Sequence, residues 1–572
     1  MMKKVTANVK MTSFLLGLAL LLLIAPFYSQ VNGGGSGLSL TYNIPTWVIA
    51  SWIIAVGLWL IANNKTFTYP QLWYYFVVFP VITLASSMLA EISQPINWLF
   101  RQLVILGGFF FLFALFQYQA KQYVLDRILL VLVLTAGLHA LLGSMQIIAP
   151  DHLPAYFPPN NDFVPRGMFQ QINVQVSFLV TGLVICLYLI SRPSFRLSSP
   201  LVKFLVIIAF TLAVYVIIAS GSRVGLLSIL LSVPLVLWSR RQQLRPQKNL
   251  LIILFVISCG SVWAGQSGLQ QTMDKTVRAT DNSYATARVA MYTIGLELVV
   301  KEPVHGYGIG GFLKAWNQQS SDFVSRHPET VLPPYITHPH NELLFWMIEG
   351  GLLVLAGILI VIVGIILALY RCGFQRGGAY AAMLIPISLH TQVELPFYIS
   401  AVHWFLWLFL IYLVLRHSSR TINVTFSAAV TWSLRTVAVI FAIGVTLFMI
   451  NTARAQADLY SFLHDRNKQP PYLQLALNNL YFKPVAEQLA MRSMLYASIE
   501  NNDRARVKIF ETWAQEYVEI NPELKMYEDL ISASVFLRPE GKGCDAIKDG
   551  LTMYAHNKPL QQAYKDKCSV QD

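Results

Sequence analysis

Residues 352–369 read LLVLAGILIVIVGIILAL, a run in which no side chain is charged. About twenty such residues are needed for a helix to cross roughly 30 Å of membrane hydrocarbon. Similar apolar runs recur along most of the chain, which has 572 residues and is 55% hydrophobic. Only 12% of the residues are charged, whereas soluble globular proteins carry about 25%. The sequence therefore predicts an all-α protein that crosses a membrane many times.

The apolar runs divide the chain into about thirteen predicted spans. The first follows Lys3, Lys4 and Lys10, as the apolar part of a signal peptide would. It is interpreted as a retained span, because no clear small-residue cleavage site precedes a soluble domain. The predicted spans are residues 14–29, 46–62, 72–90, 98–117, 128–149, 169–190, 204–219, 224–238, 249–265, 342–369, 378–391, 399–416 and 431–450.

The net charge of +13 is distributed in a way that indicates topology rather than nucleic-acid binding. With a cytoplasmic N-terminus, every predicted cytoplasmic loop contains Lys or Arg and, apart from Asp126, almost no acidic residue. This is the positive-inside pattern of multi-pass membrane proteins. The long loop 266–341 and the tail 451–572 are then both predicted on the extracytoplasmic side.

The predicted topology gives the chain four regions. Residues 1–265 are expected to form an N-terminal transmembrane bundle and residues 266–341 a water-facing lid. Residues 342–450 are expected to form the C-terminal transmembrane helices, and residues 451–572 a separate helical domain. Within the lid, a helical pattern from about residue 284 to residue 300 precedes the glycine-rich turn HGYGIGG at 305–311.

The tail is predicted to be helical, because its apolar residues recur at helical spacing. Two neighbouring patterns predict helical hairpins similar to tetratricopeptide repeats, although the fixed period of true repeats is absent. Cys544 and Cys568 are expected to form a disulfide in an oxidising compartment. The two predicted helix faces comprise Ala486, Ala490, Met494 and Ala497, and then Val507, Phe510, Trp513, Tyr517 and Ile520.

Polar residues gather at the outer ends of the predicted spans, although they lie far apart in the sequence. Such a set suits a substrate with a lipid tail in the bilayer and a polar head at its surface. Because the sequence has neither a Cys/His pattern typical of zinc sites nor a carboxylate pair at ligand spacing, no metal or other cofactor is expected. The set comprises Arg166, Gln171, Asn173, Ser222, Arg223, Arg288, His338, His340, Asn341, Glu342, Glu394 and Tyr398.

Three of these stretches resemble the O-antigen ligase/polymerase (WaaL/Wzy) superfamily. The sequence HNEL at 340–343, running into EGG at 349–351, is similar to the signature of that superfamily. The stretch from Arg288 to Phe312 resembles the element that precedes the signature, apart from Met291, close to where a tryptophan is expected. Ser222 and Arg223 resemble the superfamily's Ser-Arg turn.

Three further motifs resemble one branch of this superfamily, the PglL-type protein O-oligosaccharyltransferases of Gram-negative bacteria. They are RG at 166–167, QIN at 171–173 and ELP at 394–396. All the motifs occur in order between about residues 160 and 400. The resemblance implies a polytopic GT-C-like protein of the bacterial inner membrane, with its active site in the periplasm.

The resemblance also implies inverting transfer of an oligosaccharide from undecaprenyl diphosphate to a hydroxyl group. His340 is assigned as the proton acceptor, since a neutral imidazole is basic near pH 7. Arg223 and Arg288 are assigned to the departing diphosphate, because guanidinium groups match phosphate oxygens. Substrate binding is assigned to Arg166, Gln171, Asn173, Asn341, Glu394 and Tyr398.

Each assignment has a structural alternative. His340 would only hydrogen-bond the backbone at the start of a helix, Arg223 would only reach the membrane surface, and Arg288 would form an ordinary salt bridge. Most of the polar residues assigned to substrate binding would cap helices, and Tyr398 would be an interfacial aromatic residue. Glu349, which precedes two glycines, is interpreted as structural.

The leading functional prediction is transfer of glycan to Ser or Thr of exported proteins such as pilins. The tail favours this acceptor, because ligases tend to end near the last span. The alternatives with the same chemistry are transfer to lipid A-core, as by an O-antigen ligase, and transfer to a second lipid-linked glycan, as by a polymerase. A polyisoprenoid flippase or transporter often has repeated halves and ionisable residues near the midplane. Only His139, His390 and His403 favour that class, and no repeat is found.

Overall fold

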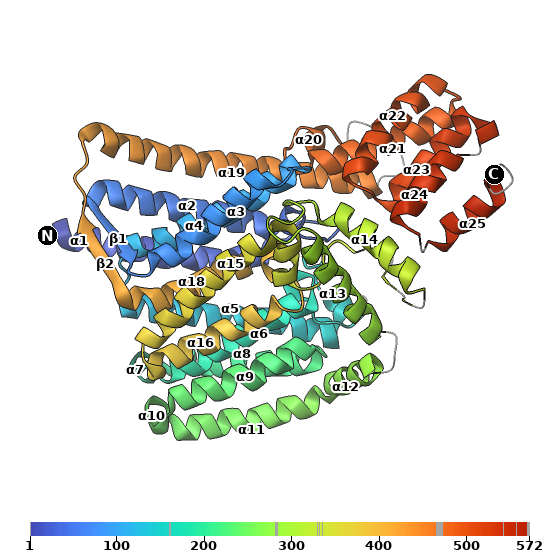
Figure 1. Ribbon diagram of the computed structural model, residues 1–572. Coiled ribbons are helices and arrows are strands. Elements are labelled where there is room, and N and C mark those ends of the chain that lie inside the picture. The colour runs from blue at the N-terminus through green and yellow to red at the C-terminus, as the bar shows by residue number, and fades with distance from the viewer. Residues whose placement is uncertain are drawn as a thin grey trace. The chain divides into compact units, whose positions relative to one another are not determined.

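The computed structural model describes residues 2–158, 162–280, 284–328, 330, 332–333, 336–464, 473–541, 543–555 and 557–568. Most of these residues form α-helices (Figure 1). The chain divides into two compact units, and five helices have residues in both of them. These shared helices are α3 (Trp73–Leu89), α4 (Pro95–Gln117), α12 (Gln266–Thr280), α15 (Glu342–Arg371) and α19 (Ala428–His464).

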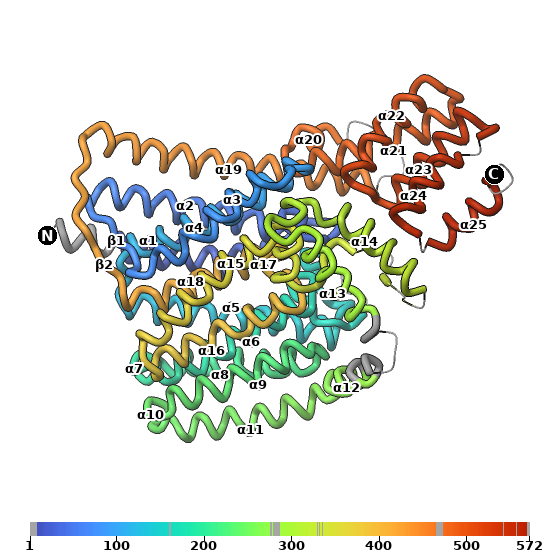
Figure 2. The backbone as a smooth tube through the Cα atoms, viewed as in Figure 1, coloured from blue at the N-terminus to red at the C-terminus, as the bar shows by residue number. Residues whose placement is uncertain are grey.

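The first unit contains residues 1–78, 104–276 and 359–453, and α6 lies at its centre. Nearly every residue of α6 from Val174 onward is buried, as expected for a helix that is apolar on all sides. Figure 2 shows α8, α9 and α11 running alongside one another in this unit. The helices confined to this unit are α1 (Met2–Ala19), α2 (Asn43–Asn64), α5 (Gln122–Ile148), α6 (Ile172–Ile190), α7 (Pro193–Arg196), α8 (Pro200–Ala219), α9 (Arg223–Ser239), α10 (Arg241–Leu244), α11 (Lys248–Ala264), α16 (Phe374–His390), α17 (Pro396–Ile399) and α18 (Ala401–Leu415).

Small residues let these helices approach one another closely. A β-carbon added at Gly182 of α6 would lie 2.4 Å from the β-carbon of Ala136 of α5, and one added at Gly137 would lie 2.6 Å from that of Ala209 of α8. Helices in membranes commonly associate in this way, because lipid gives no hydrophobic drive for larger side chains to pack. Gly137 and Gly182 therefore fix the spacing of α5, α6 and α8.

The prediction of a mostly helical, multi-pass membrane protein is confirmed. Within the described residues, ten helices are long and apolar enough to cross a membrane. The remaining three predicted spans coincide with α3, α9 and α16, which each have 17 residues. The count of thirteen spans stays a prediction.

The structure also contains a small sheet that the sequence did not predict. Strand β1 (Thr66–Pro70), between α2 and α3, pairs in antiparallel register with β2 (Ser419–Asn423), between α18 and α19. The two connections are too short and too polar to stand out beside the apolar spans. The all-α prediction is corrected to this extent.

The second unit contains residues 79–103, 277–358 and 454–572, so helices of the long loop and of the tail belong to one unit. Asn317 of α14 donates a hydrogen bond from Nδ2 to the carbonyl oxygen of Pro522 at 2.9 Å. The backbone N–H of Ala555 donates to Ser321 Oγ at 3.2 Å. The helices confined to this unit are α13 (Tyr284–Lys301), α14 (Phe312–Arg326), α20 (Gln474–Leu477), α21 (Lys483–Glu500), α22 (Arg504–Ile520), α23 (Leu524–Leu537), α24 (Cys544–Met553) and α25 (Lys558–Lys567).

The predicted helix faces of the tail are only partly correct. On α22, Val507 and Phe510 are buried, whereas Ile520 is 41% exposed. On α21, Ala486 is buried and Ala497 is exposed. The reason is that α21 contributes to two separate apolar clusters, one near each end, so its buried face changes along the helix.

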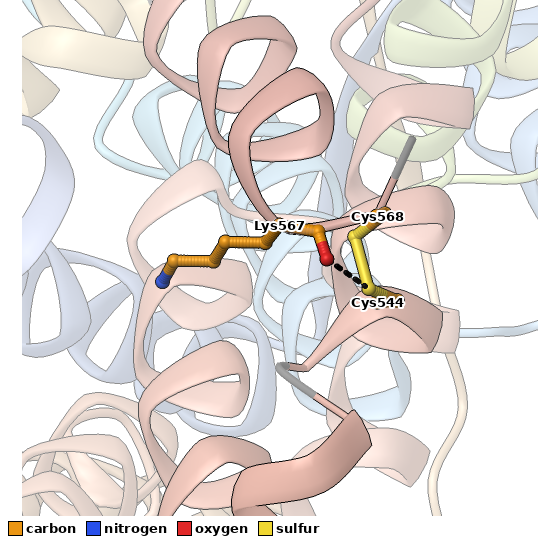
Figure 3. The surroundings of a disulfide bond; sticks show 3 residues. All are labelled: Cys544, Lys567 and Cys568. Carbon is orange, nitrogen blue, oxygen red and sulfur yellow. Dashed lines mark hydrogen bonds between the residues drawn. A yellow bond between two sulfur atoms is a disulfide. The ribbon is translucent and has the colours of Figure 1, made fainter. Parts of the chain in front are cut away.

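The expected disulfide between Cys544 and Cys568 is present (Figure 3). It joins the start of α24 to the end of α25 across a sequence separation of 24 residues. The bond closes the C-terminal helical hairpin, of which Ala546, Tyr554 and Leu560 reach the apolar core of the tail.

Removal of this bond should destabilise the C-terminal hairpin selectively. In the chain-entropy account, closing a loop of this length contributes about 3 kcal/mol. Replacing both cysteines by serine should therefore raise hydrogen exchange in α24 and α25 relative to α22, as measured by mass spectrometry of the purified protein. Equal protection of α24 and α25 with and without the bond would contradict the prediction.

Candidate functional site

The N-terminus of α6 holds a carboxylate in the first unit. Gln171 accepts a hydrogen bond from the N–H of Val174 at 2.7 Å, which caps the helix. The other end of the same amide, Nε2, donates to Glu394 Oε2. Gln171 therefore caps α6, which was its structural alternative, and also contacts Glu394, another residue assigned to substrate binding.

A buried histidine supports Glu394 from the other side. Nε2 of His390, which is fully buried at the end of α16, lies 3.2 Å from Glu394 Oε2. Nδ1 of the same ring lies 2.9 Å from Ser177 Oγ on α6. The carboxylate of Glu394 is thus oriented from both α6 and α16.

The other two histidines within spans also have structural partners. His403 Nε2 donates to the carbonyl oxygen of Val174 at 3.0 Å. His139 stacks on the ring of Phe169 with a centroid separation of 4.6 Å. A hydrogen bond therefore holds His403 in the core, and ring packing holds His139.

Arg223 begins α9 at a turn that is fastened to α6. Ser222 caps α9 by accepting from the N–H of Gly225 at 3.2 Å, and its hydroxyl donates to Asn173 Oδ1 at 2.8 Å. The side chain of Arg223 is exposed, and no carboxylate of the described residues forms an ion pair with it. Asn173 therefore positions the Ser-Arg turn, while the guanidinium of Arg223 stays available to a ligand.

Helix α12 packs directly on this turn, which the sequence did not predict. Gly221 adopts a positive φ of 63° within the turn. A β-carbon added at Gly268 of α12 would lie 2.3 Å from the carbonyl oxygen of Ile218. The predicted lid therefore begins with a helix, α12, that packs against the backbone beside Arg223.

Arg166 and Tyr398 are the other predicted residues of the first unit. Arg166 forms an ion pair with Asp162, and both side chains are substantially exposed. Tyr398 lies on the short helix α17 and is 43% exposed. The structure thus links Gln171, Asn173 and Glu394 to α6, whereas Arg166 is engaged locally.

In the second unit, His340 lies directly before α15 in an unusual backbone conformation. Its φ of 51° is left-handed, which costs a non-glycine residue about 1–3 kcal/mol and often marks a functional position. Its N–H donates to His338 Nδ1 at 3.2 Å, and the two rings meet edge to face at 4.5 Å. His338, which the motif does not include, therefore helps to fix His340, while Asn341 caps α15 through the N–H of Leu344 at 2.9 Å.

The glycine-rich turn and the residues just before it form hydrogen bonds with the backbone at a break in α15. Gly351 has φ 65°, which interrupts the helix. The N–H of Leu352 donates instead to Pro303 O at 2.8 Å, and the N–H of Tyr307 donates to Ile348 O at 3.0 Å. A β-carbon at Gly306 would lie 2.4 Å from Ile348 O, so the close approach requires glycine. This motif is therefore a backbone clamp on α15.

Arg101 of α4 holds the same region together, although the sequence motifs did not identify this residue. Its guanidinium forms a salt bridge with Glu349, which is 1% exposed. Glu349 also accepts from the N–H of Gly310 at 3.0 Å. The Arg101 Cζ lies 4.5 Å above the ring of Phe345. The available signal was an arginine inside an apolar span, which membrane proteins tolerate only with partners. The structural interpretation of Glu349 agrees with these contacts.

Arg288 lies on α13 with an exposed side chain, and the described part of the chain provides no ion pair for it. The salt bridge between α13 and α14 is formed by Glu297 and Arg326 instead, at 2.7 Å. The hydrogen bond from Arg326 holds the pKa of Glu297 below its ordinary value. Met291, where the motif departs from the superfamily, is buried against the rest of this unit.

Within the described ranges, no group of three or more His, Cys, Asp or Glu side chains could hold a metal ion. The two sets of residues provide imidazole, carboxylate, amide and guanidinium groups.

Comparison with protein families gives two matches. A family described as O-antigen ligase matches residues 207–360, which include Arg223, Arg288 and His340. A family described as virulence factor membrane-bound polymerase, C-terminal, matches residues 379–568, which include Glu394 and the tail. No curated protein matches the chain. The matches support the superfamily of O-antigen ligases and polymerases and, with it, glycosyl transfer as the general activity.

The Arg101–Glu349 pair should behave as a coupled unit in a double-mutant cycle. Arg101→Ala leaves a buried carboxylate without its cation, which should cost about 3–5 kcal/mol of unfolding free energy. Adding Glu349→Ala should recover part of that loss. Denaturant unfolding of the purified protein measures both effects.

Arg166→Ala is the matched control, because its ion pair with Asp162 is exposed and should be worth no more than about 1 kcal/mol. Additive effects of the two substitutions at Arg101 and Glu349 would mean that the pair does not hold α4 to α15.

Proposed function

We propose that this protein transfers a preassembled oligosaccharide from undecaprenyl diphosphate to Ser or Thr hydroxyls of exported proteins such as pilins. The reaction takes place on the periplasmic side of the bacterial inner membrane. The observation that carries the proposal is the placement of Arg223. Its exposed guanidinium stands at the N-terminus of α9, inside the match to the O-antigen ligase family. Helix N-termini and guanidinium groups both attract phosphate oxygens.

The proposed reaction forms one bond and breaks one bond. The acceptor oxygen attacks the anomeric carbon, its proton passes to His340, and undecaprenyl diphosphate departs from the opposite face with the bonding electrons. The anomeric configuration is inverted. Arg223 and Arg288 stabilise the negative charge on the departing diphosphate, and no metal is required.

The remaining site residues are assigned to binding. The carboxylate of Glu394 is held by Gln171 and His390, so it can accept hydrogen bonds from sugar or acceptor hydroxyls without reorienting. Asn173 acts through Ser222 and positions the turn of Arg223. Asn341 acts through the cap of α15, while Arg166 and Tyr398 are assigned to the outer part of the substrate.

A second candidate is the same chemistry with a lipid-linked glycan as acceptor. The polymerase family match favours it, because that match extends through the tail to residue 568. The test is to incubate purified enzyme and lipid-linked glycan with pilin, with lipid A-core or with no added acceptor. Intact mass then identifies the product. A product on pilin supports our proposal, and longer lipid-linked chains alone would establish the polymerase.

Removal of the tail would confuse this test, because Asn317 and Ser321 of α14 bond to tail residues. A chain ending near residue 453 would lose these partners together with any acceptor site. The acceptor should therefore be identified with the full chain.

His340→Ala should lower transfer by at least about a hundredfold, because general base catalysis contributes about 10²–10⁴. Initial rates of glycan transfer, with protein amounts normalised, measure the effect. His327→Ala, at an exposed histidine after α14, is the matched control and should retain activity. A His340→Ala enzyme with more than about a tenth of normal activity would remove His340 from the proposed role.

Arg223 should be sensitive to the shape of its side chain as well as to its charge. Arg223→Lys keeps the charge but loses the two-pronged contact with phosphate, so a partial loss is expected, with a larger loss for Arg223→Ala. The kinetic constants for the lipid-linked donor measure this series. Donor KM and turnover unchanged in both variants would exclude Arg223 as the diphosphate ligand.

A further inference from the structure

A second basic site lies in the first unit, at the end of α18 remote from Glu394. A pocket of about 330 Å³ is lined by Tyr69, Gln71, Trp73, Tyr74, Arg371 and Arg420, among other residues. Because α18 has 15 residues and a helix rises 1.5 Å per residue, about 22 Å of helix separates this pocket from the Glu394 end. The pocket is thus distinct from the polar contacts around Glu394.

The pocket is built from three segments that are far apart in the sequence. Strand pairing places Tyr69 of β1 opposite Arg420 of β2, and the N–H of Gln71 donates to Ser418 O at 2.9 Å. Helix α15 brings Arg371 to the same place. Its Gly364 lies so close to Tyr75 of α3 that an added β-carbon would be 2.6 Å from the Tyr75 β-carbon. The sheet and the helix contact therefore fix the pocket wall.

The charges of the pocket are not balanced within the protein. Both Arg371 and Arg420 line it, and its lining contains no carboxylate. Neither guanidinium forms an ion pair with any residue that the structure describes. Two cations on one pocket repel each other unless an anion lies between or beside them. The arrangement therefore favours an anionic ligand.

The pocket also lies at the boundary of the membrane. Candidate span α2 ends at Asn64, α15 ends at Arg371, and the span containing α18 ends at Ser418, immediately before β2. Trp73 and Tyr74 are both more than 40% exposed, as is typical of aromatic residues at the level of lipid headgroups. Lipid phosphates occupy this depth, and basic pockets between span ends are known to bind them.

We propose that this pocket binds the phosphate group of an anionic membrane lipid such as phosphatidylglycerol. Arg371 and Arg420 contact the phosphate oxygens through their paired N–H groups, and the Tyr and Trp side chains add neutral donors and cover the glycerol. The positive-inside rule explains a positive charge in this region, but it does not explain why two arginines converge on one aromatic pocket. The inference is independent of the proposed transferase activity.

The test uses the purified full-length protein in neutral detergent. Phosphatidylglycerol, phosphatidylcholine or inorganic phosphate is titrated, and the thermal unfolding midpoint and the lipid retained in native mass spectrometry are recorded. Phosphatidylglycerol should stabilise the protein, and the double variant Arg371→Gln/Arg420→Gln should lower its apparent affinity by at least about tenfold. Arg371→Lys/Arg420→Lys should give an intermediate affinity and separates loss of binding from loss of fold.

Arg241→Gln/Arg245→Gln is the matched control, because both residues are exposed on the connection between α9 and α11 and the same charge is removed. It should bind phosphatidylglycerol as the wild type does. Equal lipid stabilisation of all the variants would overturn the proposal. Arginine-dependent stabilisation by inorganic phosphate, with none by phosphatidylglycerol, would overturn the lipid source and identify a soluble phosphate ester.

Discussion

A break in a membrane helix exposes backbone groups that lipid cannot satisfy, and this constraint governs the arrangement around α15. At Gly351 the helix is interrupted, and the N–H and C=O groups on either side need new partners. Residues 303–307 supply them through Pro303 O and the Tyr307 N–H, and Ser86 Oγ donates to Gly350 O at 3.1 Å. The backbone approach is too close for side chains, which explains the run of glycines. The Arg101–Glu349 pair then joins this clamp to α4, so the start of α15, which follows His340, is held by several elements.

The N-terminus of α6 has a comparable organising role in the first unit. Helix termini leave N–H groups without partners inside the helix, and the side chain of Gln171 fills one of these positions. Because an amide has both a donor and an acceptor, the same side chain also binds Glu394. Two residues later, Asn173 accepts from the cap residue of α9. The helix that lies at the centre of this core thus positions polar groups from α9 and from the end of α16.

Ten of the predicted spans coincide with helices that are long and apolar enough to cross a membrane, because length and apolar composition are local properties of a sequence. The sequence also identified the residues at the start of α6, α9 and α15, since motifs are local in sequence. It did not predict β1 and β2, because their pairing joins segments about 350 residues apart. It also did not predict α12, whose close packing on the turn between α8 and α9 depends on Gly268. The partners of Glu349 could not be predicted, because the neighbour of a buried charge is fixed by packing. The predicted helix faces of the tail were only partly correct for a related reason, because α21 packs into two separate apolar clusters.

The arginines of this protein differ in whether the chain supplies them with a carboxylate. Arg101 and Arg326 have acidic partners, so their charges are neutralised by the fold. Arg223 has none among the described residues, and it stands at the N-terminus of a helix. That end already carries partial positive charge, so a second cation there is unfavourable by about 0.3–1 kcal/mol. Basic residues at the other end of α9 follow from membrane topology, and they lie where the helix dipole favours them. Topology gives no such reason for Arg223. Arg223 is thus held against the helix dipole, on a turn that Asn173 fastens. Among the described residues no carboxylate balances its charge, and a bound diphosphate would do so.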